Sequence, residues 1–121
     1  MPPKPVLPER DRALLWDMLL AVRDAQNFVA GLDEAGFMAS RLHQSAVIRA
    51  LEVLGEAAGK ISPESRAALP HFPWREMTGL RHRLIHGYAD VRLDVVWHVA
   101  TERMTPLAAL LSEVLSPEAR A

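Results

Sequence analysis

The segment Val47-Ile-Arg-Ala-Leu-Glu-Val-Leu-Gly-Glu-Ala-Ala-Gly-Lys-Ile61 carries a strong structural signal. Its apolar side chains recur every three or four residues, which is the period of one face of an α-helix. The alanines on this face are small enough to let a second helix approach closely. The segment therefore predicts a helix that packs against other helices. Its apolar positions are Val47, Ala50, Leu51, Leu54, Ala57, Ala58 and Ile61.

The same period recurs on both sides of this segment. One apolar stripe runs from Glu9 to a stop at Gly31, and another runs from Leu93 to Val114, with Pro106 predicting a kink or a break. Ser62-Pro63 resembles a helix cap followed by a short helix, and a further helix is expected between Trp74 and Gly87. No segment shows the sustained alternation of a β-strand. We therefore expect an all-α fold, an antiparallel helical bundle of about five helices.

The length and composition set the domain organisation. A chain of 121 residues suits one domain. Four of the nine prolines fall in residues 1–8, which predicts a flexible Pro-rich lead-in. Residues 9–116 are expected to form the helical domain, and residues 117–121 a C-terminal tail.

The charge and cysteine content exclude several kinds of function. Lys and Arg number 14 against 15 Asp and Glu, so the chain cannot hold nucleic acid by bulk charge and would need a local basic patch. The absence of cysteine excludes disulfides, thiol nucleophiles and thiolate metal sites. No apolar run reaches the length of a membrane span, and the N-terminus lacks the core of a signal peptide. We expect a soluble, cytoplasmic protein that does not bind membranes.

The segment Gly79-Leu-Arg-His-Arg-Leu-Ile-His-Gly-Tyr88 concentrates the chemistry of the chain, and three interpretations compete for it. The leucines and isoleucine can be core positions, with Arg and His merely solvated near a helix end. His82 and His86 are four residues apart and could share a metal, but no carboxylate or third ligand accompanies them. The third interpretation is RNA cleavage without a metal or other cofactor.

RNA supplies its own nucleophile, the 2′-OH, so an enzyme needs only proton transfer and a phosphate holder. Histidine suits the proton transfers, and arginine suits the anionic transition state. Arg81 and His86 supply both groups, with Tyr88 close by. These two residues are five apart, about 140° around an ideal helix. They converge only if the helix ends between them or if two subunits combine their copies.

Arg81-His-Arg-Leu-Ile-His86-Gly-Tyr88 resembles the Arg-x4-His-x-Tyr signature of the HepT-like family of the HEPN superfamily. The resemblance extends in order from Arg10 to Leu115, nearly the whole chain. The other landmarks are Asp17-Met-Leu-Leu-Ala-Val22, Leu51-Glu-Val-Leu-Gly-Glu-Ala57, the pair Pro70 and Trp74, and Val95-Val-Trp97.

The resemblance implies a helical toxin of a toxin–antitoxin pair, a homodimer built around the motif, and metal-independent ribonuclease activity on an RNA substrate. Arg81 and His86 would be catalytic. The implied partner is a minimal nucleotidyltransferase antitoxin that transfers AMP to Tyr88. His82, Arg83 and Arg92 are candidate supporting or RNA-contacting residues. His82 stands where the family usually has Asn, and Arg92 stands where Asp is common.

Two other functions stay open at this point. The chain can be a catalytically silent HEPN binding module that partners a nucleotidyltransferase, or a purely structural helical dimer. A toxin would arrest growth when expressed alone, and His86→Ala would relieve the arrest. A binding module would cause no arrest in either form.

Overall fold

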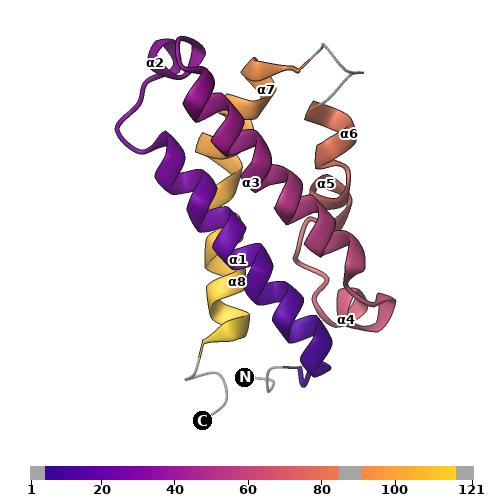
Figure 1. The fold of residues 1–121 in the computed structure, drawn as a ribbon. Helices are drawn as coiled ribbons and strands as arrows, with labels where there is room; N and C mark the ends of the chain where they lie inside the picture. Colours follow the sequence, from indigo (N-terminus) through magenta and orange to yellow (C-terminus); the bar gives the residue numbers. More distant parts are fainter. Residues whose placement is uncertain (1–4, 85–90, 117–121) are drawn as a thin grey trace.

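Long antiparallel helices form the body of the protein (Figure 1). The computed structural model describes residues 5–84 and 91–116, and no β-strand occurs within these two ranges. Helix α1 (Glu9–Val29) lies beside α3 (Arg41–Lys60), and α8 (Met104–Leu115) also packs against α1. The predicted all-α fold is confirmed. The described part is divided more finely than the expected five helices, because two of the predicted helices are subdivided.

Local signals explain where the first helices begin and end. Gly31 has a φ of 80°, a left-handed conformation that glycine adopts without steric cost, and it follows α1 as the sequence predicts. The short α2 (Glu34–Met38) is capped by Asp33, whose side chain accepts a hydrogen bond from the Gly36 amide. Ser40 caps α3 in the same way through the His43 amide. Capped turns of this kind reverse the chain between α1 and α3.

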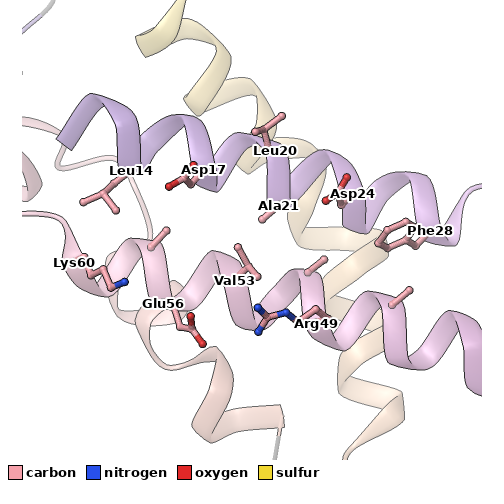
Figure 2. A pocket seen from close by; sticks show the side chains of 13 residues that line it. Leu14, Asp17, Leu20, Ala21, Asp24, Phe28, Arg49, Val53, Glu56 and Lys60 are labelled. Atoms are coloured by element: carbon pink, nitrogen blue, oxygen red, sulfur yellow. The ribbon is translucent and has the colours of Figure 1, made fainter. Parts of the chain in front are cut away.

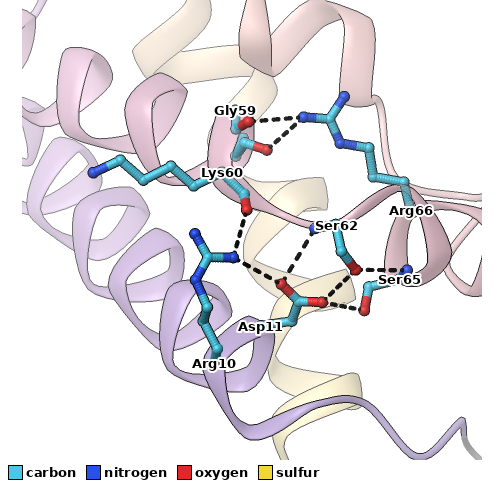
Figure 3. A network of polar contacts seen from close by, with 8 residues as sticks. Arg10, Asp11, Gly59, Lys60, Ser62, Ser65 and Arg66 are labelled. Atoms are coloured by element: carbon cyan, nitrogen blue, oxygen red, sulfur yellow. Dashed lines mark hydrogen bonds and ion pairs between the residues drawn. The ribbon is translucent and has the colours of Figure 1, made fainter.

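A buried carboxylate fastens the start of α1 to the start of α4 (Pro63–Ala68), as Figure 3 shows. Ser62 caps α4 as predicted, accepting from the Ser65 amide. The Ser62 and Ser65 hydroxyls donate to Asp11 Oδ2 at 2.6 and 2.5 Å, and the Ser62 amide donates to Oδ1 at 3.2 Å. Burial opposes ionisation of Asp11, but these hydrogen bonds outweigh it and hold its pKa below the ordinary value. The carboxylate therefore joins segments more than 50 residues apart.

The helix predicted between Trp74 and Gly87 is divided in the described residues. It consists of α5 (Trp74–Thr78), a break at Gly79, and α6 (Leu80–Leu84). Gly55 in α3 makes room for this pair, because a Cβ at that position would lie 3.0 Å from the Met77 carbonyl oxygen and 3.7 Å from Leu80 Cβ. A glycine in the middle of α3 is thus explained by the close approach of α5 and α6.

The last stripe stays helical through Pro106, and its distortion comes earlier than the proline. Helix α7 (Leu93–His98) passes into a π-helical turn, η1 (Val99–Arg103), and then into α8. Pro106 has no amide hydrogen, and its ring would clash with the carbonyl of residue 102 in a regular helix. The wider π turn contains that carbonyl and relieves the conflict. The expected kink is therefore a change of helix type rather than a break.

The core lies where α1, α3 and α8 meet, with α6 and α7 closing one end. Its fully buried side chains include Leu15, Val22, Leu54 and Leu111. Leu7, within the segment predicted to be a flexible lead-in, is also buried against this core. Within the described residues, no helix is both long enough and apolar enough to cross a membrane.

Candidate active site

Helix α6 presents the first half of the Arg-x4-His-x-Tyr motif to solvent. Leu80 and Leu84 are fully buried and fix one face of the helix against the core. Arg81, His82 and Arg83 lie between them in sequence and are exposed. This part of the motif is therefore a short helix whose core face is apolar and whose remaining surface is cationic.

The three exposed residues of α6 point in different directions. Successive residues of a helix are about 100° apart, so Arg81 lies about 100° from Leu80, and Arg83 lies about 300° from it. Arg81 and Arg83 thus lie on opposite flanks of α6, with His82 on the outward face between them. The structure brings these candidates to one helix but does not bring the two arginines to one face.

Arg92, at the position before α7, already has a carboxylate partner. Its guanidinium donates two hydrogen bonds to Asp94, at 3.1 and 3.0 Å. These hydrogen bonds are the main reason that the pKa of Asp94 is below its ordinary value. The Arg92 amide donates to the Leu84 carbonyl, so the chain returns to the end of α6. Arg92 is therefore close to α6 along the backbone, while its side chain is engaged with Asp94.

His86 and Tyr88 lie outside the described residues, so their roles and the convergence of His86 with Arg81 stay predictions. The hypothesis that His82 and His86 share a metal ion is untested for the same reason. Within the two described ranges, no group of three or more His, Asp or Glu side chains is placed to hold a metal ion.

An open hollow of about 850 Å³ lies beside α6, and we call it the cationic hollow. Arg83 reaches it from α6, and residues of α5, α7 and η1 complete it. Three of its residues are arginines and one is a glutamate, so its net charge is positive. The lining residues are Phe72, Pro73, Trp74, Arg75, Glu76, Arg83, His98 and Arg103.

The single carboxylate of the cationic hollow is held by one of its arginines. Arg103 donates to both oxygens of Glu76, at 2.7 and 2.8 Å. This hydrogen bonding is the largest cause of the lowered pKa of Glu76, and the nearby charges of Arg103, Arg83 and His98 add to it. The same contact raises the pKa of Arg103. Arginines of α6 and η1 thus attract the same carboxylate.

Sequence reasoning missed the part played by His98 and Arg103. It singled out neither residue. Arg103 is 27 positions from Glu76, and no local spacing indicates that they meet. Trp74 is half-buried. Its indole N–H donates to the Leu69 carbonyl at 3.0 Å, and its ring stacks on Phe72.

A second hollow, of about 550 Å³, lies between α1 and α3 (Figure 2). Its floor is apolar, with Leu20 and Phe28 among the exposed hydrophobic residues of α1. Asp17 and Asp24 of α1 and Arg49 of α3 supply charges around it. None of the candidate site residues lines this groove. No histidine is among its lining residues, so we do not assign the chemistry to it.

The chain is similar to known proteins, and this similarity agrees with its all-α fold and its Arg-x4-His-x-Tyr motif. The sequence profile described as "Ribonuclease HepT-like" matches residues 18–114. The chain is 41% identical over 95 residues to "Putative RNase MJ0125" of Methanocaldococcus jannaschii, covering 78% of this chain and 82% of that protein. It is 36% identical over 93 residues to "Probable ribonuclease HepT" of Thermococcus cleftensis, covering 77% and 84%. No solved structure matches the chain.

Helical architecture and motif together define a HEPN-type protein. More narrowly, the chain belongs to the HepT-like ribonuclease family, as the match to residues 18–114 shows.

Proposed function

We propose that this chain is a metal-independent RNA endonuclease that acts as the toxin of a toxin–antitoxin pair. The observation that carries the proposal is the complete Arg81-x4-His86-x-Tyr88 signature in a member of this family, with Arg81 exposed on α6. RNA is the proposed substrate because the family and the related proteins named above are described as ribonucleases.

The proposed reaction uses the 2′-OH of the RNA as its nucleophile. His86 takes the proton of the 2′-OH, and the 2′-oxygen attacks the adjacent phosphorus. The bond from phosphorus to the 5′-oxygen breaks, and the proton passes from the imidazole to that oxygen. The products are a 2′,3′-cyclic phosphate and a 5′-hydroxyl. Arg81 stabilises the negative charge on the phosphate oxygens, because its guanidinium stays charged and can donate two parallel hydrogen bonds.

We further propose that the active form is a homodimer built around the motif. Arg81 and His86 lie about 140° apart on an ideal helix, so one uninterrupted helix cannot aim both at one phosphate. Two subunits that face each other across the motif would combine an arginine of one copy with a histidine of the other. In this arrangement, both residues would act at one site.

Tyr88 is the proposed point of control by a nucleotidyltransferase antitoxin. The phenol oxygen attacks the α-phosphorus of ATP, the phenol proton is lost, and pyrophosphate leaves. The new AMP group adds negative charge and an adenosine two residues from His86, where it competes with RNA for the arginines. Tyr88 is the only tyrosine of the chain, so Tyr88→Phe should abolish AMP transfer to tyrosine. Intact-mass spectrometry after incubation with the partner and ATP measures this directly.

Cleavage of total RNA in EDTA, by the wild type and by identically prepared His86→Ala, tests the nuclease activity. We expect the wild type to cut and the variant to be inactive. Equal cleavage by both proteins would contradict the assignment of His86. Failure of a folded wild type to cut would contradict the nuclease proposal and favour the catalytically silent binding module. The presence of His82 in place of the usual Asn gives that alternative a specific basis.

A further inference from the structure

We propose that the cationic hollow is a phosphate-binding subsite for single-stranded RNA, separate from the Arg81 position. The inference rests on RNA as the substrate of the proposed function and extends the site to residues outside the motif. Arg75, Arg83 and Arg103 are its phosphate-binding groups. They come from α5, α6 and η1, so only the folded chain assembles them.

Two of the three arginines have side chains available to an anion. Arg75 and Arg83 are exposed, and among the described residues neither forms an ion pair within 4.0 Å. Arg103 is 42% exposed and uses its Nε and Nη2 atoms on Glu76. Guanidinium groups prefer to donate two hydrogen bonds to a phosphate or carboxylate. Glu76 attracts Arg83 only at longer range. A hollow in which two such groups form no ion pair within 4.0 Å among the described residues is therefore suited to a polyanion.

The apolar part of the lining of the cationic hollow strengthens this attraction. Phe72, Pro73 and Trp74 line it with apolar surface. Trp74 is fixed by its hydrogen bond to Leu69 and by stacking on Phe72, with ring centroids 5.3 Å apart. A rigid apolar wall lowers the local dielectric constant and focuses the field of cations that share one cleft. The hollow thus combines positive charge with a surface that displaces water.

The position of the cationic hollow relative to α6 gives the bound strand a path. Arg83 faces the hollow, and Arg81 lies on the other flank of the same five-residue helix. An RNA strand with its scissile phosphate at Arg81 would cross the outward face of α6, past His82, to place another phosphate at Arg83. This geometry assigns His82 and Arg83 to strand binding and Arg81 to the reacting phosphate.

Glu76 limits the strength of the subsite and provides a variant that changes it in the opposite direction. Its carboxylate neutralises part of the charge and occupies two donors of Arg103. Glu76→Gln removes the negative charge while keeping a side chain of nearly the same shape. The variant should bind RNA roughly threefold more tightly. A protein that merely lost structure would not gain affinity.

The test measures binding of a fluorescently labelled oligouridylate with 2′-O-methyl riboses, which lacks the nucleophile and cannot be cut. The double variant Arg75→Gln/Arg83→Gln is compared with Arg23→Gln/Arg41→Gln, which removes the same charge from exposed positions outside the hollow. We expect the first pair to weaken binding about tenfold and to lower the slope of log K against log salt by about 1.4, which is about 0.7 for each lost phosphate contact. The control pair should change affinity less than twofold.

Equal weakening by the two double variants would overturn the inference, because it would mean that only net charge matters. Unchanged or weaker binding by Glu76→Gln, with the fold intact by circular dichroism, would also overturn it. If the wild type cuts RNA but the hollow variants bind normally, the subsite fails while the proposed nuclease stands. If the expected binding changes occur without cleavage, the subsite stands and the proposed nuclease fails. If the wild type neither binds nor cuts RNA, both proposals fail.

Discussion

Replacing Asp11 by asparagine tests whether the buried carboxylate fastens the start of α1 to the start of α4. Asp11 is 1% exposed and accepts three hydrogen bonds, two from hydroxyls and one from the Ser62 amide. Asp11→Asn keeps the size of the side chain but removes the charge and replaces one acceptor oxygen with a donor NH2. Whichever way the asparagine amide is turned, its NH2 group faces either the two hydroxyls or the Ser62 amide N–H, all of which donate to Asp11.

The expected loss follows from the number and kind of these contacts. A hydrogen bond to a charged group contributes about 1.5–3 kcal/mol, and the contributions of one network do not add in full. We expect Asp11→Asn to lower the free energy of unfolding by about 2–3 kcal/mol at pH 7. For a domain of this size, the melting temperature should fall by roughly 10 °C. Asp24→Asn, at an exposed position of the same helix, should change stability by less than about 0.5 kcal/mol.

The pH dependence gives an independent test of the same contact. Because the pKa of Asp11 is lower in the folded state than in the unfolded chain, its carboxylate adds stability above the unfolded pKa. That stability is lost as the pH falls through the folded pKa, which is below 3.8. Wild type and Asp11→Asn should therefore differ most near neutral pH and converge in acid.

Urea unfolding followed by circular dichroism, at several pH values from neutral to acid, measures these differences. Equal stability of Asp11→Asn and Asp24→Asn at pH 7 would refute the reasoning. A difference between wild type and Asp11→Asn that persists unchanged into acid would show that the ionised carboxylate is not the source.

Two further predictions concern helix packing and the proposed catalytic arginine. Gly55→Ala should destabilise the protein by about 1–3 kcal/mol, because its Cβ would lie 3.0 Å from the Met77 carbonyl oxygen. A Cβ at Gly59 would have no atom within 4 Å, so Gly59→Ala should stabilise the protein by about 0.5–1 kcal/mol. Urea unfolding should therefore show changes of opposite sign for the two variants. Arg81→Lys should keep the charge but lose bidentate phosphate contact, lowering kcat roughly 100-fold in the RNA cleavage assay. Cleavage at the wild-type rate would remove Arg81 from the mechanism.

Much of the helical fold was predictable because its signals are local. The period of apolar residues located α1 and α3, and Ser62 with Pro63 located the start of α4. The division at Gly79 and the π turn before Pro106 were not predicted in this form. These details depend on how a segment packs against others, since α5 and α6 must both reach the surface of α3 around Gly55.

The sequence alone determined the fold class and the family, because periodicity and an ordered motif are properties of residue spacing. Only the tertiary structure placed Arg83 of α6 in one hollow with Arg75 and Arg103. It also placed Glu76 and Arg103, 27 residues apart, in contact within the cationic hollow. Such contacts arise where helices distant in sequence pack together. Their partners are fixed by helix rotation and core burial, which spacing along the chain does not encode.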